Sequence, residues 1–330
     1  MSENGRGDGS WSGRCVLVTG ATGIVGSWLV KELLARQATV VVLVRDADPQ
    51  SELVRSGDIR RTVVVQGELE DPRAAERAVN EHEVDTIFHL GAQTLVGAAH
   101  RNPLATFEAN VRGTYNVLDA AHRHAALVQA VVVASSDKAY GESDRLPYTE
   151  DMPLDGRHPY EVSKVCAELL SLSYHHTYGV PVAIARCANV YGGGDLNWSR
   201  IVPGTIRSLH RSEPPVLRSD GTYVRDYLYV KDAARSYLLL AEALAAGSAA
   251  GESFNFGTDS PFTVRSLVDR IAALMGCDGI DPVILDNAVG EIHAQTLDAG
   301  KARRQLGWDA AYDLERGLTE TIEWYRDFLG

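Results

Sequence analysis

Two short stretches of this chain carry side chains suited to acid–base chemistry on a hydroxyl group. The stretch SSDKAYG supplies Ser136, Asp137 and Lys138, and the stretch YEVSK supplies Tyr160 and Lys164, four residues apart. On a helix this spacing puts the last two side chains on one face, although an exposed helical face can show it too. An ammonium beside a phenol favours the phenolate, so Lys164 is expected to lower the pKa of Tyr160 and let it accept a proton.

The element that must position the first stretch is an apolar run at 127–134, which predicts a buried parallel strand. Its polar continuation then emerges at the carboxyl end of a sheet, where open α/β folds bind ligands. Helical segments separate further runs of this kind, so we predict an α/β, Rossmann-type doubly wound parallel sheet. These runs cover 15–18, 39–44, 63–69, 84–93, 182–186 and 253–256, and one long helix is expected at 103–124.

A glycine-rich turn, TGATGIVG, joins the first strand to the first helix. Gly20 permits the tight turn, Gly23 lets backbone N–H groups approach a pyrophosphate, and Gly26 lets helix and strand pack closely. Because strand, turn and helix follow in this order, the pattern predicts a dinucleotide site rather than a plain turn. The residues assigned to this site are Gly20, Thr22, Gly23, Ile24, Val25 and Gly26.

The end of the second strand bears on the choice of cofactor, because it places Arg45 beside Asp46. A carboxylate here binds the ribose hydroxyls of NAD, whereas an arginine can pair with the additional phosphate of NADP. NAD is expected, and Arg45 leaves NADP open. The end of the third strand, at Glu68 and Leu69, could meet the adenine, and His89 is interpreted as a core histidine with satisfied hydrogen bonds.

Composition argues against several classes of protein. With 330 residues and a net charge of -12, the chain is a poor candidate for nucleic-acid binding. Its apolar runs are too short for a membrane helix, and its four widely spaced cysteines favour free thiols in a reducing compartment over disulfides or a metal site. We therefore expect a cytoplasmic protein without a membrane partner, and a disordered tail at 1–12.

Taken together, the motifs resemble those of the extended short-chain dehydrogenase/reductase family, specifically its nucleotide-sugar epimerases and dehydratases. The resemblance runs from about residue 14 to about 325 and includes TGATGIVG, HLGAQ, YEVSK, RCANVYG, RDYLYVKD and KARRQLGW. It implies cofactor contacts from Leu90, Ala92, Gln93, Asn110, Tyr160 and Lys164. It also implies contacts to a nucleotide-diphosphate sugar from Gln93, Ser136, Asn189, Arg200, Arg225 and Arg304.

The resemblance also implies a domain organisation and a homodimer. A dinucleotide-binding Rossmann domain is expected at 13–187 plus 227–257, and a smaller, discontinuous nucleotide-sugar-binding domain at 188–226 plus 258–330. The homodimer would form through the helices at 103–124 and 160–178.

Within the family, SSDKAY followed by GGGD and RIVP is most similar to CDP-glucose 4,6-dehydratases. In most sugar 4,6-dehydratases this strand ends in Thr-Asp-Glu, with the aspartate as acid and the glutamate as base. Here Asp137 holds the acid position and Lys138 stands where the glutamate would be. The segment VRDYLY departs from that branch and is more like that of the 4-epimerases.

The resemblance implies a 4,6-dehydratase with tightly bound nicotinamide and internal return of hydride. Tyr160, helped by Lys164 and Ser136, would remove the carbon-4 hydroxyl proton, while Lys138 and Asp137 would act as base and acid in the loss of water. If Asp137 and Lys138 form only a surface ion pair, a UDP-sugar 4-epimerase is the better interpretation. A non-catalytic dinucleotide-binding protein is the third hypothesis, and it needs neither Tyr160 nor Lys164.

Overall fold

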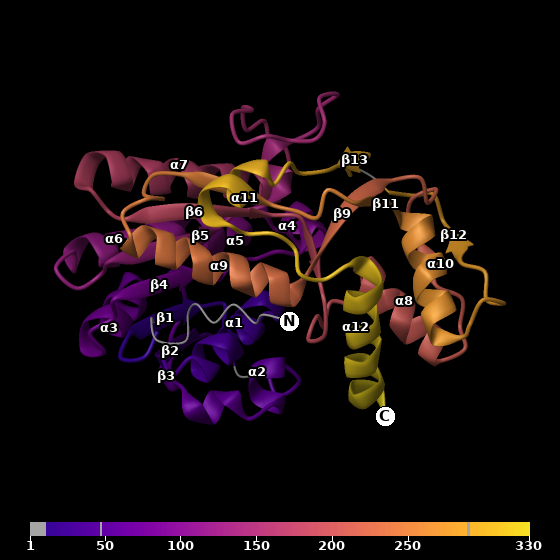
Figure 1. The fold of residues 1–330 in the computed structure, drawn as a ribbon, viewed down its shortest axis with the longest axis horizontal. Coiled ribbons are helices and arrows are strands. Elements are labelled where there is room, and N and C mark those ends of the chain that lie inside the picture. The colour runs from indigo at the N-terminus through magenta and orange to yellow at the C-terminus, as the bar shows by residue number, and fades with distance from the viewer. Residues whose placement is uncertain (1–10, 47, 289–290) are drawn as a thin grey trace, which may run out of the picture.

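The larger part of the molecule is built on a parallel sheet of seven strands (Figure 1). The computed structural model describes residues 11–46, 48–288 and 291–330. The strand order is β10-β6-β5-β4-β1-β2-β3, which confirms the predicted α/β sheet. Its order reverses beside β1, the place where such sheets bind ligands. The strands are β1 (Cys15–Thr19), β2 (Thr39–Val44), β3 (Val63–Gln66), β4 (Thr86–His89), β5 (Ala130–Ala134), β6 (Val182–Cys187) and β10 (Ser253–Phe256).

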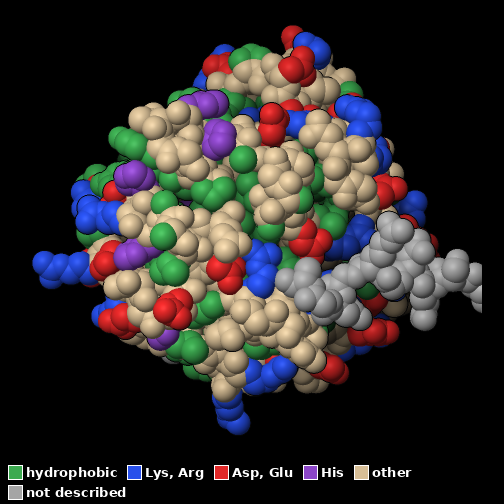
Figure 2. All heavy atoms as spheres, turned by 60° about the vertical axis from the view of Figure 1, so that its left-hand side comes forward, with side chains coloured by type: hydrophobic (Ala, Val, Ile, Leu, Met, Phe, Trp, Pro, Cys, Tyr) green, Lys and Arg blue, Asp and Glu red, His purple; other side chains and the backbone are tan. Residues whose placement is uncertain are grey.

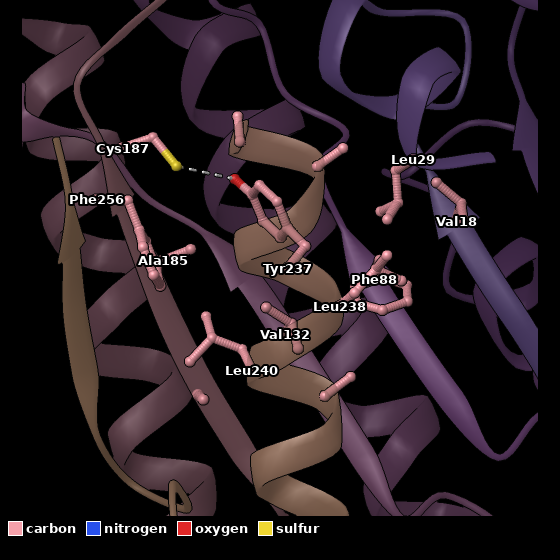
Figure 3. Close-up of a cluster of buried hydrophobic side chains, with 14 of the residues drawn as sticks. Val18, Leu29, Phe88, Val132, Ala185, Cys187, Tyr237, Leu238, Leu240 and Phe256 are labelled. Atoms are coloured by element: carbon pink, nitrogen blue, oxygen red, sulfur yellow. Dashed lines mark hydrogen bonds between the residues drawn. The ribbon is translucent and has the colours of Figure 1, made fainter. Parts of the chain in front are cut away.

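Helices cover both faces of this sheet, which explains why its central strands are apolar throughout. One face packs against α1 (Ile24–Ala35), α9 (Val230–Ala245) and α11 (Gly300–Leu306). The other packs against α3 (Pro72–Glu81), α6 (Gly113–Arg123) and α7 (Pro159–Tyr178). In Figure 3, Tyr237, Leu238 and Leu240 of α9 lie among side chains of the central strands, Phe88 and Val132 among them.

The helix predicted at 103–124 is present but is not uniform. It consists of α5 (Pro103–Phe107), a π-helical turn η2 (Glu108–Arg112) and α6. Pro103 occupies the first turn as expected, and the Asn102 side chain caps the helix by accepting from the Ala105 N–H at 3.2 Å. Shorter helical elements on this domain are α2 (Glu52–Arg55), η1 (Asp58–Arg61), α4 (Val96–Arg101) and η3 (Asp137–Tyr140).

A smaller domain follows the sixth strand of the large sheet. Its central strand, β9 (Val224–Tyr229), pairs with β7 (Asn189–Tyr191), β11 (Pro261–Thr263) and β13 (Ala294–Gln295). Around them lie α8 (Ile201–His210), α10 (Val264–Met275) and α12 (Leu314–Leu329), and the pair β8 (Val216–Leu217) and β12 (Val283–Ile284). Thr263 caps α10, since its side chain accepts from the Ser266 N–H.

The predicted domain boundaries need three corrections. The boundary at residue 227 falls inside β9, which pairs only with strands of the small sheet among the described residues. The Trp308 ring lies 5.1 Å from that of Phe256, so the segment with α11 packs on the large core. Trp11 is buried and its Nε1 donates to Glu242 at 2.7 Å, which makes the predicted disordered tail wrong at this position. Residues 1–10 of that tail lie outside the described residues.

No helix in the described ranges is long and apolar enough to cross a membrane.

Candidate active site

The turn between β1 and α1 is pressed against the loop that follows β4. Gly20 has a φ of +70°, and a Cβ there would lie 2.7 Å from the backbone nitrogen of Gly91. A Cβ on Gly26 would overlap the carbonyl oxygen of Gly20. Gly23 stands at the N-terminus of α1, whose first N–H groups face out of the turn. The turn therefore has no room for a side chain at Gly20 or Gly26, and such a cradle would fit the pyrophosphate of a dinucleotide.

The residues predicted to meet the adenosine lie at the ends of β2 and β3. Arg45 and Asp46 are both exposed, and the guanidinium Nε donates to the carboxylate at 2.7 Å. The Arg45 guanidinium is thus paired within the chain. Glu68 is exposed, whereas Leu69 packs under the loop after β4, where a Cβ on Gly91 would lie 2.6 Å from its Cδ1.

The π-helical turn η2 surrounds Asn110, one of the predicted cofactor residues. Its side chain accepts from the Gln93 N–H at 2.6 Å and donates to the Gln93 carbonyl at 3.0 Å and to Ser163 Oγ at 2.9 Å. Ser163 Oγ in turn donates to the Tyr160 carbonyl at 2.6 Å. One buried amide therefore fastens the loop with Leu90, Ala92 and Gln93 to the helix that carries Tyr160. Irregular π-turns are frequent at functional sites.

His89 is the buried core histidine that the sequence predicts. Its Nδ1 lies 2.9 Å from Thr19 Oγ1 and its Nε2 lies 3.1 Å from Thr114 Oγ1. Burial, with a smaller effect of the Lys164 charge, lowers the pKa of His89 to about 3. The imidazole is therefore neutral at physiological pH.

Helix α7 places Lys164 against the end of β5. The helix starts at Pro159, and the Glu161 carboxylate accepts from the Arg157 and His158 N–H groups at 2.8 and 3.1 Å. The Lys164 Nζ donates to the Ala134 carbonyl at 2.8 Å. Burial lowers the pKa of Lys164 to about 8, against the opposing effect of Glu168, so the ammonium form still predominates at pH 7.

Tyr160 is buried one turn before Lys164, at the same strand end. Burial raises the pKa of Tyr160 to about 12, while its hydrogen bond with Ser136 acts in the opposite direction. Asp137 raises this pKa further and Arg200 lowers it. The prediction that Lys164 lowers the pKa of Tyr160 below its usual value is therefore wrong for the chain by itself, because desolvation of the phenolate outweighs every nearby cation.

Asp137 and Lys138 form an ion pair, but it does not lie on the surface. Their side chains are 4% and 24% exposed, and the Lys138 Nζ is 3.7 Å from the Asp137 Oδ1. The Ser136 hydroxyl donates to Asp137 Oδ1 at 2.9 Å and accepts from the Lys138 N–H at 3.2 Å. Asn189 donates to Asp137 Oδ2 and accepts from Lys138 Nζ, both at 3.4 Å. The interpretation as an exposed ion pair is contradicted, and Asn189 joins the group.

Of the three arginines predicted to contact substrate, Arg200 is the one whose charge acts on Tyr160. Its guanidinium donates to Asp195 at 3.0 Å and to Thr94 at 3.3 Å. Arg225 is buried on β9 and donates to the carbonyls of Val224 and His293, at 2.8 and 3.0 Å.

Arg304 lies apart from the other predicted residues. It is exposed on α11 and lines a cavity with Thr149, Asp298 and Lys301. Within the described chain, this cavity includes none of the side chains grouped around Tyr160 and Lys138. The structure therefore does not bring Arg304 to the candidate site.

Two features of the site escaped the sequence analysis. A buried ion pair lies behind it, where Arg186 Nη2 is 2.6 Å from Glu168 Oε2 and Ser135 Oγ donates to Glu168 Oε1 at 2.5 Å. An arginine inside the apolar strand VAIARC was the available signal for this pair. Gln295 accepts from Lys138 Nζ at 3.3 Å, and no sequence signal marks it, because its strand has only two residues.

Comparison with known proteins places the chain among related sequences. The sequence profile described as the NAD dependent epimerase/dehydratase family matches residues 16–257. A CDP-glucose 4,6-dehydratase from Salmonella typhimurium is 30% identical over 335 residues, which cover 97% of this chain and 92% of that protein.

Two solved structures show the same architecture. A dTDP-glucose 4,6-dehydratase from Streptomyces venezuelae, with NAD bound, is 30% identical with a TM-score of 0.86, over 95% of this chain and 97% of that one. A UDP-glucose 4-epimerase from Thermotoga maritima, with UDP-glucose, is 29% identical with a TM-score of 0.87, over 96% and 100%.

Proposed function

The chain belongs to the NAD dependent epimerase/dehydratase family, and from this premise we propose that it is a nucleotide-sugar 4,6-dehydratase, which converts an NDP-hexose to an NDP-4-keto-6-deoxyhexose. The observation that carries the proposal is the Asp137–Lys138 pair, buried beside Ser136 at the end of β5. Loss of water needs an acid and a base in addition to the tyrosine, and this pair can supply both. The similarity to the Salmonella enzyme supports the same reaction.

The residues present fit NAD as the cofactor of this NAD dependent family. The cradle formed by Gly20, Gly23 and Gly26 would hold the pyrophosphate, and the Asp46 carboxylate would bind the ribose hydroxyls. The NAD bound in the similar Streptomyces structure and the NAD dependence of the family favour NAD over NADP. Bound NAD supplies a hydride acceptor at carbon 4 and a hydride donor at carbon 6, so no net oxidation occurs.

The side chains of the chain itself move the protons. Tyr160 must first lose its own proton, because burial keeps the phenol protonated in the chain by itself. As the phenolate it would receive the proton of the carbon-4 hydroxyl, with Ser136 hydrogen-bonded to the same oxygen and Lys164 one helical turn away. Transfer of one proton from the Lys138 ammonium to the Asp137 carboxylate would give a neutral amine and a carboxylic acid. The ketone acidifies the hydrogen on carbon 5, which the Lys138 amine takes as a proton while Asp137 protonates the departing carbon-6 hydroxyl. Water leaves and a carbon–carbon double bond forms between carbons 5 and 6. Lys138 then returns its proton to carbon 5 as carbon 6 is reduced, and the proton held by Tyr160 replaces the one that Asp137 gave to the water.

For the substrate diphosphate we propose Arg200 and Arg225, with Asn189 beside them. Guanidinium groups bind phosphate oxygens bidentately. Arg200, the N-cap of α8, acts electrostatically on Tyr160, and Arg225 on β9 stands opposite Gln295, which contacts Lys138. The exposed position of Arg304 removes it from this set.

Mass spectrometry of the reaction with several nucleotide-glucose compounds tests the proposal. Loss of one water supports dehydration, and Asp137→Asn and Lys138→Met should each lower that rate by about 10²–10⁴ while NAD binding is kept. Asp269→Asn is the matched control, because Asp269 lies exposed on α10 in an ion pair with Arg265. Normal water loss in Asp137→Asn would reject the acid role, and normal water loss in Lys138→Met would reject the base role.

A nucleotide-sugar 4-epimerase is the second candidate, favoured by the segment VRDYLY and by the similarity to the Thermotoga epimerase. This reaction requires the Tyr160 group but no second acid and base. A product of unchanged mass and altered stereochemistry would identify it. No change with any donor would instead indicate a non-catalytic binding protein.

We further propose a homodimer through α5, α6 and α7, working in the cytoplasm. Large apolar side chains are exposed on these helices at Leu104, Leu169 and Tyr178. Figure 2 turns this side of the molecule forward and shows apolar, histidine and mixed charged side chains on it. Light scattering should give twice the chain mass, and Leu169→Glu should shift it toward the monomer. A monomeric wild type at micromolar concentration would refute the proposed dimer.

A further inference from the structure

One face of the small sheet lies over the Lys138 amine. Asn189 on β7 and Gln295 on β13 each accept a hydrogen bond from Nζ, at 3.4 and 3.3 Å. In the parallel ladders, Asn189 stands opposite Tyr227 and Gln295 stands opposite Arg225. Paired residues of parallel strands point to the same side, as do residues two apart on β9, so these four side chains share one face. The small domain thus offers two neutral acceptors to a lysine of the large domain.

The orientation of the Gln295 amide follows from this contact. An ammonium can only donate, so it must face Oε1, and the Nε2 is turned away from it. Gln295 is 1% exposed, and its Nε2 is one of the buried side-chain atoms without a hydrogen-bond partner in the described chain. Burying an unpaired amide donor costs stability. Fold stability therefore does not account for a glutamine here, whereas the contact with Lys138 does.

The charges around Lys138 make the neutrality of Gln295 significant. The Asp137 Oδ1 lies 3.7 Å from Nζ, so one negative charge already stands beside the amine. Asp137 also acts electrostatically on Tyr148, Tyr160, Cys187 and Asp226. Arg225 stands opposite Gln295 on the neighbouring strand. A carboxylate at position 295 would place a further negative charge in direct contact with the amine. A carboxamide instead holds the nitrogen in place without adding charge.

We propose that Gln295 is a positioning residue for Lys138: it fixes the amine from the small domain by accepting a hydrogen bond, and it does so without adding a negative charge. This inference rests on the proposed role of Lys138 as the base. It adds a residue that stands 157 positions away in the chain and on the other domain.

The test combines NMR titration of lysines labelled with ¹³C at Cε with pH profiles of the dehydration rate. The Lys138 signal is assigned by its loss in Lys138→Met. Gln295→Glu should raise the titration midpoint of this ε-amino group by about 1–3 pH units. The rising limb of the pH–rate profile should move to higher pH by the same amount. Gln295→Met, which keeps the chain length, should lower the midpoint by about 1 unit, because an acceptor for the ammonium is lost. Thr205→Val, at another buried unpartnered side chain, should change neither.

The outcomes separate this inference from the proposed function. Full dehydration by Lys138→Met would overturn the proposed base and this inference with it. If Lys138→Met is inactive and both Gln295 variants titrate and turn over like the wild type, only the role of Gln295 is overturned. Equal shifts in Thr205→Val would also overturn it, because they would show a general effect of small-domain substitutions. Urea unfolding of each variant confirms that the folded protein is being titrated.

Discussion

Glu168→Gln removes the negative partner of a guanidinium that has almost no contact with solvent. The Arg186 and Glu168 side chains are 6% and 1% exposed. Arg186 Nε donates to both carboxylate oxygens, at 3.0 and 3.1 Å, and Ser135 Oγ donates to Oε1 at 2.5 Å. Since a guanidinium does not deprotonate in proteins, the positive charge stays in place after the substitution. The pair fastens α7 to β6, so the helix carrying Tyr160 depends on it.

The expected cost follows from the burial of this charge. Removing one partner of a buried ion pair costs about 3–5 kcal/mol, because the other charge remains desolvated. The glutamine keeps one acceptor oxygen, and Arg186 Nη1 still donates to Tyr140 Oη at 2.7 Å, so we expect about 3 kcal/mol. The double variant Glu168→Gln, Arg186→Met leaves no charge buried and should lose less stability than Glu168→Gln alone.

Urea unfolding followed by circular dichroism, at one protein concentration, measures these differences. The matched control is Asp119→Asn, which breaks a pair on α6 whose arginine, Arg123, is 66% exposed. Such exposed helical pairs contribute about 0.3–0.5 kcal/mol. If Glu168→Gln costs no more than Asp119→Asn, the buried charge is not what stabilises this region. A double variant less stable than Glu168→Gln would also refute the reasoning.

Three further predictions concern protons. His89 has a pKa of about 3 in the folded chain and about 6.5 in the unfolded chain, so it contributes stability that is present above pH 6.5 and is lost as pH falls, by about 3 kcal/mol at pH 4. Urea unfolding at pH 7 and pH 4 should therefore show a smaller loss of stability at pH 4 for His89→Gln than for the wild type. Burial raises the pKa of Asp226 to about 6, so its contribution is complete below pH 3.8 and is lost as pH rises through 6, by about 3 kcal/mol. The free energy of unfolding of Asp226→Asn, relative to that of the wild type, should therefore be higher at pH 7 than at pH 4. An equal difference from the wild type at the two pH values would contradict this. Tyr160→Phe should lower kcat by about 10²–10⁴ with NAD affinity unchanged by fluorescence titration, and an active variant would exclude the tyrosine as base.

Local patterns predicted the sheet and the cradle because short-range physics controls them. Apolar runs become strands buried on both faces, although the run at 127–134 pairs only from Ala130 onward, where hydrogen bonding to neighbouring strands begins. Gly20 and Gly26 could be identified because a tight turn excludes a Cβ whatever the rest of the fold does. The boundary at residue 227 was wrong because a strand pattern does not say which sheet the strand joins, and only its pairing decides this.

The sequence alone determined which chemical groups stand at the strand end: Ser136, Asp137 and Lys138, with Tyr160 and Lys164 one helical turn apart. Only the tertiary structure decided their electrostatics, because desolvation depends on segments far along the chain. Burial raises the pKa of Tyr160, where the local spacing had predicted a decrease. The tertiary structure also places Gln295, from a two-residue strand, against Lys138, and it leaves Arg304 outside the candidate site. No local sequence pattern contains either distinction.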